Sequence, residues 1–166
     1  MTAASSPIII CGIAGSGKST LAAALADHLH WQFVEGDDLH PPANRARMAA
    51  GQPLTDADRW PWLDRIAAQL AAWSATRRPG VISCSALRRR YRDRLRDAVP
   101  VRFVFLDIGA ERAEARIARR AGHFMPASLV ASQLATLERP SPDEAITIAA
   151  DLPLNMQLAA VIAALD

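Results

Sequence analysis

The sequence predicts an α/β fold, a three-layer sandwich built around a five-stranded parallel sheet. Short apolar runs rich in β-branched residues alternate along the chain with longer helix patterns, as in sheets whose strands are buried on both faces. The chain has 166 residues, and 51% of them are hydrophobic, which is enough apolar material for one real core. No stretch has the composition of a linker, so we expect one domain over residues 1–166.

Strand patterns and helix patterns follow one another in regular order. The strands are short and apolar, and are expected at 8–11, 32–34, 81–84, 101–106 and 145–149. The helices are expected at 18–30, 42–50, 57–76, 86–99, 110–121, 127–138 and 154–165. Because connections between parallel strands cross over the faces of a sheet, helices in this order should cover both faces.

Local signals explain several of the expected boundaries. Gly51 and Pro53 close the second helix, since neither residue continues a helix well. Thr55, followed three residues later by Asp58, resembles a capping box and so begins the next helix. Pro61 is tolerated in that helix because it lies within the first turns.

A glycine-rich run follows the first expected strand. The run GIAGSGKST, residues 12–20, fits the phosphate-binding pattern G-x-x-x-x-G-K-[ST] and leads into helix-forming residues. Glycines let such a loop curl until its N–H groups point at phosphates, and the helix N-terminus that follows favours anions. Lys18 is expected to reach the β- and γ-phosphates, and the Ser19 hydroxyl to ligate Mg²⁺. The residues expected to bind the nucleoside triphosphate are Gly12, Ile13, Ala14, Gly15, Ser16, Gly17, Lys18, Ser19 and Thr20.

An acidic cluster follows the second expected strand. Ligands gather at the carboxyl ends of the strands in such sheets, so Glu35, Asp37 and Asp38 should lie near the triphosphate. One carboxylate would orient or deprotonate an attacking hydroxyl, and another would hold Mg²⁺ directly or through water. The alternative is a solvated acidic turn. The third strand has no acidic residue, so support for the metal is expected from Glu35 or Asp37, and either Glu35 or Asp38 points into the site.

Cationic side chains lie on segments that should cover the same end of the sheet. Arg45 and Arg59 suit an anionic substrate, because a planar guanidinium pairs with both oxygens of a carboxylate. After the third strand, Ser85 is expected as the N-cap of a helix whose N-terminus favours anions. In the basic run that follows, one or two arginines, such as Arg88, should face the site. Plain solvent exposure is the alternative for each arginine.

The segment after the fourth expected strand predicts a lid. Arg112, Arg116 and Arg120 are spaced four apart, so they share one face of a helix. Arginines on a hinged helix can move onto the transferring phosphoryl group and neutralise its developing charge, with Gly122 and Pro126 as hinge points. The alternative is an exposed face paired with nearby glutamates.

Charge and composition exclude some classes of partner. The formal net charge is only +2, with a pI of about 8.9, so the chain lacks the overall field that marks nucleic-acid binders. No apolar stretch approaches the roughly 20 residues that span a bilayer, and the N-terminus does not resemble a secretion signal. We therefore expect a cytoplasmic protein that binds neither nucleic acid nor membranes. Cys11 and Cys84 each end a strand pattern and are expected as buried thiols.

Four segments together resemble the gluconokinase family, whose members are small P-loop kinases for sugar acids, related in fold to shikimate and nucleoside monophosphate kinases. In chain order they are GIAGSGKST, GDDLHPPANRARMAAGQPLTDADRWPWL, CSALRRRYRDRLR and RIARRAGHFMPASLVASQLATLE. The resemblance covers nearly the whole chain. It implies phosphorylation of the 6-hydroxyl of D-gluconate with ATP and Mg²⁺, by a cytosolic enzyme that is typically a homodimer.

The resemblance also implies roles for segments and residues. Substrate-binding helices at about 38–60 and a lid at about 112–128 would belong to a single kinase domain. The implied catalytic residues are Lys18, Asp37 and Arg120, with Asp37 orienting or deprotonating the sugar hydroxyl. The implied contacts to gluconate are Asp37, His40, Arg45, Arg59, Ser85, Arg88 and His123. The implied contacts to ATP are the phosphate-binding loop, Arg116, Arg120 and Pro153, while Ser19 would hold Mg²⁺.

Two other functions fit part of the pattern. Another hydroxy-acid kinase of the same fold, such as a shikimate kinase, would share the phosphate-binding loop. Against it, this chain has Ser85, Ala86 and Leu87 where that family has a glycine triplet. A module that uses ATP as a switch without turnover would need neither a second acidic cluster nor lid arginines. Both features are present, so we expect an enzyme.

Overall fold

The carboxyl ends of five parallel strands meet along one edge of the sheet. The computed structural model describes residues 6–120 and 127–166. Its strands are β1 (Ile8–Cys11), β2 (Gln32–Glu35), β3 (Gly80–Ser83), β4 (Arg102–Asp107) and β5 (Ala145–Ala149). They lie in the order β2-β3-β1-β4-β5, and every pairing is parallel. The predicted five-stranded parallel sheet is therefore confirmed.

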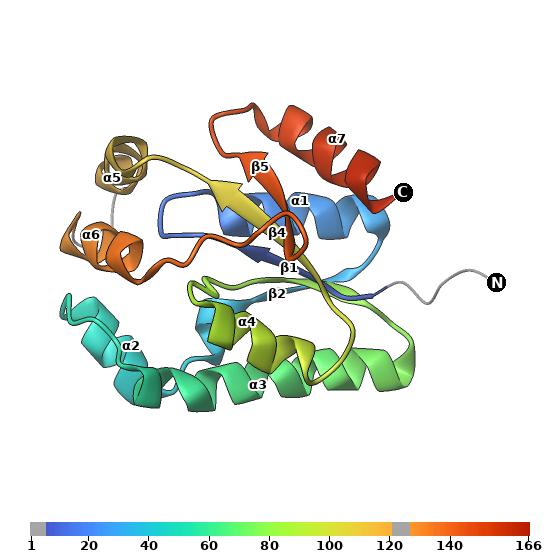
Figure 1. Cartoon of the computed structure of the whole chain (residues 1–166), viewed down its shortest axis with the longest axis horizontal. Coiled ribbons are helices and arrows are strands. Elements are labelled where there is room, and N and C mark those ends of the chain that lie inside the picture. Colours follow the sequence, from blue (N-terminus) through green and yellow to red (C-terminus); the bar gives the residue numbers. More distant parts are fainter. Residues whose placement is uncertain (1–5, 121–126) are drawn as a thin grey trace.

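Helices cover both faces of this sheet. They are α1 (Lys18–Leu29), α2 (Pro42–Ala49), α3 (Asp56–Thr76), α4 (Arg89–Arg96), α5 (Ala110–Arg119), α6 (Ala127–Thr136) and α7 (Leu154–Leu165), with a short 3-10 helix, η1 (Gly36–Leu39), after β2. Helices α1 and α7 pack on one face and α3 and α4 on the other, which gives the predicted three layers (Figure 1). Among the described residues, no helix is both long enough and apolar enough to cross a membrane.

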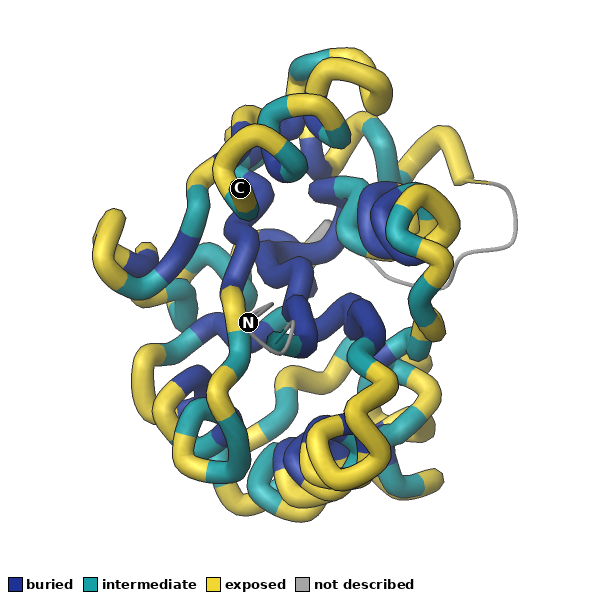
Figure 2. Tube along the Cα trace, turned by 90° about the vertical axis from the view of Figure 1, so that its right-hand side faces the viewer, coloured by how far each residue is buried: buried dark blue, intermediate teal, exposed yellow. Residues whose placement is uncertain are grey.

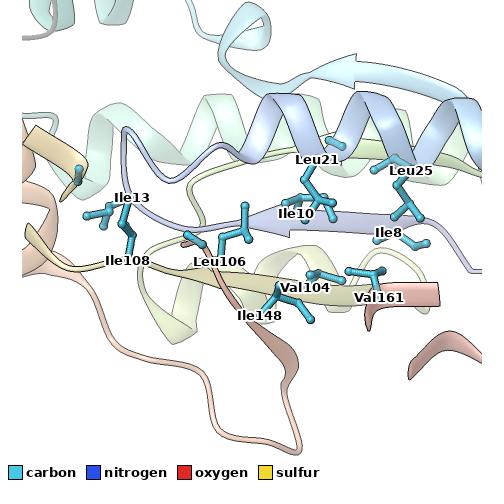
Figure 3. Packing of buried hydrophobic residues seen from close by; sticks show 14 of the residues in the cluster. Ile8, Ile10, Ile13, Leu21, Leu25, Val104, Leu106, Ile108, Ile148 and Val161 are labelled. Carbon is cyan, nitrogen blue, oxygen red and sulfur yellow. The ribbon is translucent and has the colours of Figure 1, made fainter. Parts of the chain in front are cut away.

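Alternate side chains of the central strand β1 enter two parts of the core. Ile8 and Ile10 join a cluster with Leu21 and Leu25 of α1, on the face that α1 and α7 cover (Figure 3). Ile9 points the other way, into a cluster with α3 and α4. Both faces of the strand are thus buried, which explains its unbroken apolar sequence. Figure 2 shows this buried centre inside a shell of helices whose outer sides are exposed.

The start of α3 has the predicted capping box. The N–H of Asp58 donates to Thr55 Oγ1 at 3.2 Å, and the N–H of Thr55 donates to Asp58 Oδ2 at 2.9 Å. Pro61 lies inside α3, as expected for a proline near a helix start. The box fixes the point at which the chain enters α3, the helix that supplies part of the site described below.

The helix predicted at 86–99 is shorter in the structure. It spans Arg89–Arg96, and the preceding Ala86 has a left-handed φ of 41°. Arg92 provides the physical reason: its side chain is buried, and Nη1 donates to the carbonyl oxygen of Ala86 at 2.9 Å. That bond holds the segment after β3 as a loop. Ser85 is therefore not the N-cap of α4, as predicted, but a loop residue at the carboxyl edge of the sheet.

Both cysteines are buried and neither forms a disulfide, as the sequence predicts. Burial raises the pKa of the Cys11 thiol to about 12, so this thiol stays protonated at neutral pH. Burial also raises the pKa of Cys84. Both thiols are accordingly small core side chains rather than nucleophiles.

Candidate active site

The phosphate-binding loop connects β1 to α1 at the carboxyl edge of the sheet. Gly15 has a φ of 80°, and a Cβ there would lie 2.6 Å from the carbonyl oxygen of Ala113 in α5. Both the positive φ and the lack of room for a Cβ atom require glycine at position 15. Gly17 is the N-cap of α1, and no side chain caps that helix. The first N–H groups of α1 can therefore serve a phosphate, as the sequence pattern predicts.

Lys18 and Ser19 begin α1 and line a cavity of about 320 Å³. Lys18 Nζ donates to the carbonyl oxygen of Ile13 at 3.0 Å, within its own loop. Burial lowers the pKa of Lys18, and the nearby carboxylates of Asp37 and Glu35 oppose that shift. An ammonium group held at this place is suited to pair with phosphate oxygens.

This cavity collects many of the residues that the sequence analysis selected. Of the selected residues, the lining includes Ala14, Gly15, Gly17, Lys18, Ser19, Asp37, His40, Arg59, Ser85 and Arg120. They come from the loop after β1, the start of α1, the segment after β2, α3, the loop after β3 and the residue that follows α5. Convergence of polar groups from separate elements on one hollow is typical of a substrate site.

Other selected residues lie elsewhere. Those in the described part of the chain that do not line the cavity are Gly12, Ile13, Ser16, Thr20, Arg45, Arg88, Arg116 and Pro153. Arg45 is exposed and donates to the carbonyl oxygen of Asp38. His123 and the predicted hinge points Gly122 and Pro126 lie outside the described residues.

Arg116 is bonded to the main chain rather than aimed into the cavity. Its Nη1 donates to the carbonyl oxygen of Ser16 at 3.1 Å, and its Nη2 donates to that of Ala150 at 2.7 Å. The side chain thus ties the phosphate-binding loop to the residue that follows β5. Arg112, one turn earlier, pairs with Asp151 at 3.2 Å. Arg120 follows the last residue of α5 in an extended conformation, so the prediction that all three arginines share one helix face is wrong. Of the three, Arg120 alone is part of the lining.

The acidic cluster after β2 divides into an inner and an outer part. Glu35 and Asp37 line the cavity, whereas the side chain of Asp38 is 75% exposed and points away. Ser83 Oγ at the end of β3 donates to Glu35 Oε1 at 2.6 Å. A Cβ on Gly36 would lie 2.1 Å from the Ser83 carbonyl oxygen, so glycine lets η1 approach β3. Glu35, and not Asp38, is therefore the carboxylate that accompanies Asp37.

His40 is a buried, neutral histidine beside Asp37. Its ring stacks on Trp62 of α3 with centroids 4.1 Å apart, and only 4% of the residue is exposed. Burial, followed by the charges of Arg59 and Arg45, lowers the pKa of His40 to about 4. Its Nε2 lies 3.9 Å from Asp37 Oδ1. At neutral pH the ring is therefore a hydrogen-bonding group and not a cation.

Arg59 is held in place by a tyrosine that the sequence analysis gave no role. Arg59 Nη1 donates to the Tyr91 hydroxyl at 2.9 Å, and that hydroxyl donates in turn to Asp56. The hydrogen bond from the Tyr91 hydroxyl keeps the pKa of the Asp56 carboxyl below its ordinary value. Arg90 also pairs with Asp56. Arg59 lines the cavity, where a guanidinium is suited to pair with an anion.

Gln133 and Asn44 are two further residues that sequence reasoning missed. Gln133 of α6 lines the cavity, and its Oε1 accepts the N–H of Ala14 in the phosphate-binding loop at 2.6 Å. Asn44 of α2 is buried and bonded to His40. Neither residue belongs to a spacing pattern that predicts chemistry, so only the folded arrangement identifies them.

The oxygen donors of the cavity fit Mg²⁺. In residues 6–120 and 127–166, no group of three or more His, Cys, Asp or Glu side chains could hold a metal ion by itself. The Ser19 hydroxyl and the carboxylates of Glu35 and Asp37 do line the same hollow. Mg²⁺ prefers few protein oxygens together with water and substrate phosphates, which matches this donor set.

Comparisons with known proteins give a family. A family model described as AAA domain matches residues 8–140. A gluconokinase of Gluconobacter oxydans is 50% identical over 140 residues, which cover 84% of this chain and 79% of that protein. A crystal structure of a gluconokinase from Sinorhizobium meliloti has a TM-score of 0.88 at 43% identity, covering 97% of this chain and 91% of the other.

Proteins of much lower sequence identity also share the fold of this chain. A shikimate kinase from Bacteroides thetaiotaomicron has a TM-score of 0.68 at 17% identity, covering 96% of this chain and 98% of that one. This likeness bears out the predicted P-loop kinase fold and says nothing more. The sequence identity to gluconokinases, over most of both chains, is what decides the family. The chain belongs to the gluconokinase family of P-loop kinases.

Proposed function

We propose that this chain transfers the γ-phosphoryl group of ATP to the 6-hydroxyl group of D-gluconate. The observation that carries the proposal is the cavity, in which the phosphate-binding loop faces Asp37, His40 and Arg59. Family membership supports the choice of acceptor, because the relatives compared above are named gluconokinases. The alternatives of a shikimate kinase or a nucleotide switch have no comparable support.

ATP would occupy the loop end of the cavity. N–H groups of the loop and of the α1 N-terminus would donate to its phosphates, and Lys18 would exchange the Ile13 carbonyl for phosphate oxygens. Arg120 would contact the transferring phosphoryl group and neutralise its developing charge. Arg116 would act through the loop that it ties down, and Pro153 would border the adenine.

The acceptor would lie against the segment after β2. Asp37 would take the proton of the 6-hydroxyl while the hydroxyl oxygen attacks the γ-phosphorus. The bond to the β–γ bridging oxygen breaks, and ADP leaves. Arg59 would pair with the gluconate carboxylate, which sets the sugar acid in one direction along the cavity. Positioning of the two substrates is then the main contribution of the protein.

Mg²⁺ would be held by the Ser19 hydroxyl and, through water, by Glu35 or Asp37. When bound, it would neutralise charge on the β- and γ-phosphates. Glu35 is suited to this support because the Ser83 hydroxyl fixes one of its oxygens. That arrangement supplies a carboxylate at the place where β3 itself has no acidic residue.

Further parts of the proposal rest on family membership. Arg45, Arg88 and His123 would contact gluconate, alongside Ser85 of the cavity lining. Substrate-binding helices at about 38–60 and a lid at about 112–128 would belong to a single kinase domain over residues 1–166. The enzyme would be a cytoplasmic homodimer that binds no nucleic acid.

An assay of acceptor-dependent ADP release tests the function. The purified protein is given Mg-ATP with D-gluconate, shikimate, glycerate or no acceptor. Turnover confined to D-gluconate is expected. Turnover with shikimate would keep the fold and refute the acceptor. ATP binding without any acceptor-dependent ADP would instead favour a switch module.

Replacing Tyr91 with phenylalanine should raise the KM for D-gluconate about tenfold while the KM for ATP stays unchanged. The change removes only the hydroxyl that links Asp56 to Arg59, so the guanidinium loses its fixed orientation. Steady-state kinetics with each substrate varied in turn measures the effect. The preference for D-gluconate over the uncharged polyol D-sorbitol should fall as well, because Arg59 would pair with the carboxylate that only D-gluconate has.

Asp64→Asn is the matched control for this variant. Asp64 pairs with Arg94 at 2.8 Å, also between α3 and α4, but on an exposed surface away from Arg59. The control should keep wild-type kinetics. An unchanged KM for D-gluconate in Tyr91→Phe would show that the tyrosine does not orient Arg59 for the substrate.

A further inference from the structure

We propose that Asn44 fixes His40 as the neutral tautomer that carries its proton on Nε2, so that His40 acts beside Asp37 as a hydrogen-bond donor and not as a base. The tautomer follows from the contacts of the two side chains alone. That the Nε2–H group of His40 donates to the hydroxyl of the phosphoryl acceptor rests on the proposed function. Asn44 is thereby a positioning residue for the acceptor end of the cavity.

The Asn44 amide has one favourable orientation. Asn44 is 4% exposed and lies 2.8 Å from the main-chain carbonyl oxygen of Asp58. A carbonyl oxygen only accepts hydrogen bonds, so the amide atom that faces it must be the nitrogen Nδ2. The reverse orientation would set two oxygens against each other in a buried place, which is costly. The Asp58 carbonyl therefore determines which way the amide points.

The Asn44 amide in turn determines which nitrogen of the His40 ring carries the hydrogen. The same Nδ2 lies 3.2 Å from Nδ1 of His40, in a buried contact. An amide nitrogen has two hydrogens, and the Asp58 carbonyl takes one of them. The other is directed at Nδ1, which must accept it with its lone pair. Since a neutral imidazole carries one hydrogen, that hydrogen is on Nε2.

The packing of the His40 ring sets the direction of its Nε2–H group. The stack on Trp62 fixes the ring plane at an angle of 14° to the indole, and the Trp62 Nε1–H donates to the Gly36 carbonyl at 2.8 Å. Nε2 then lies 3.9 Å from Asp37 Oδ1, and both side chains line the cavity. The charged groups around the ring are Asp37 on η1, Arg45 on α2 and Arg59 on α3. Burial and the two arginines keep the ring uncharged.

A donor and a carboxylate at this separation can share one hydroxyl group. The hydroxyl hydrogen would go to Asp37, while its oxygen accepts the Nε2–H of His40, each at an ordinary distance of about 2.8 Å. The lone pair that attacks phosphorus is then held in one direction. In this arrangement the two residues have separate tasks, since Asp37 takes the proton and His40 orients the oxygen.

Nitrogen NMR of the protein labelled with ¹⁵N-histidine tests the tautomer directly. The chain has four histidines, and the His40→Gln spectrum identifies the His40 signals by their absence. We expect one neutral His40 with a protonated Nε2 from about pH 5.5 to about pH 8. A neutral His40 ring that carries its proton on Nδ1 would overturn the inference. This measurement needs no substrate, so it stands apart from the test of the proposed function.

Variants of Asn44 test its role. Asn44→Leu should produce a mixture of both tautomers, and Asn44→Asp should draw the proton to Nδ1 and raise the pKa of His40. Either variant suffices if the other does not fold. Asn155→Leu, at an exposed position in α7, is the matched control and should keep the wild-type spectrum. An unchanged Nε2–H tautomer in a folded Asn44 variant would remove Asn44 from the proposal.

Kinetics test the donor role of His40. His40→Gln keeps an N–H donor of similar reach, whereas His40→Leu has none. The Gln variant should therefore retain a kcat/KM for D-gluconate at least about tenfold above that of the Leu variant, with equal KM values for ATP. Equal kcat/KM values in the two variants would show that no hydrogen bond from His40 reaches the acceptor.

Discussion

Asp37→Asn should lower kcat by about a hundredfold to a thousandfold while ATP binding is unchanged. The asparagine side chain has nearly the same shape, so it fills the same part of the cavity wall beside His40. It cannot take up the proton of the attacking hydroxyl, however. Turnover with D-gluconate and the Kd for ATP, measured on the same preparation, separate the two effects.

Asp38→Asn is the control for this experiment because it makes the same change one residue away. The side chain of Asp38 is 75% exposed and does not line the cavity. Its turnover should equal that of the wild type. If Asp37→Asn kept near-wild-type turnover, Asp37 would have no part in proton transfer.

Trp62→Ala should lower the free energy of unfolding by about 3 to 5 kcal/mol. The indole is completely buried among the helices and strands of one core cluster, so its loss leaves a large cavity. The change also removes the stack on His40 and the hydrogen bond to the Gly36 carbonyl. Denaturation in urea measures the loss, and the KM for D-gluconate should rise in the folded fraction.

Trp60→Ala controls for the loss of a tryptophan from the same helix. Trp60 is partly exposed and packs nearly perpendicular to the Tyr91 ring, with centroids 5.8 Å apart. Its removal should cost markedly less stability than that of Trp62. Equal losses in the two variants would mean that burial at the site does not set the stability of α3.

The fold and the phosphate-binding loop were predictable because their signals are local. The strand β1 reads as an unbroken apolar run, and Gly15 and Gly17 occupy backbone conformations that few other residues adopt. The capping box at Thr55 is likewise a matter of neighbouring residues. Such signals need no knowledge of the rest of the chain.

Contacts between distant segments were not predictable in this way. The start of α4 differs from the prediction because the Arg92 guanidinium bonds to the Ala86 carbonyl and to the carbonyl of Glu138, 46 residues away. Helix propensity does not reveal such contacts. Arg116 lies in α5 with its guanidinium held by main-chain oxygens. Arg120 follows the last residue of α5 in an extended conformation, so the two arginines do not share a helix face as their spacing predicts. The side-chain direction of an arginine depends on the partners that the fold supplies, and so does the tautomer of His40.

The two ends of the cavity follow strands that are held in the sheet to different degrees. The phosphate-binding loop follows β1, which has β3 and β4 on either side, whereas η1 follows β2, which pairs with β3 alone at the edge of the sheet. Amide hydrogens of an edge strand exchange with solvent after a smaller local unfolding than those of a central strand. The acceptor end should thus exchange first in deuterated water. Substitutions around β2 that change the preferred acceptor should therefore leave the affinity for ATP unchanged.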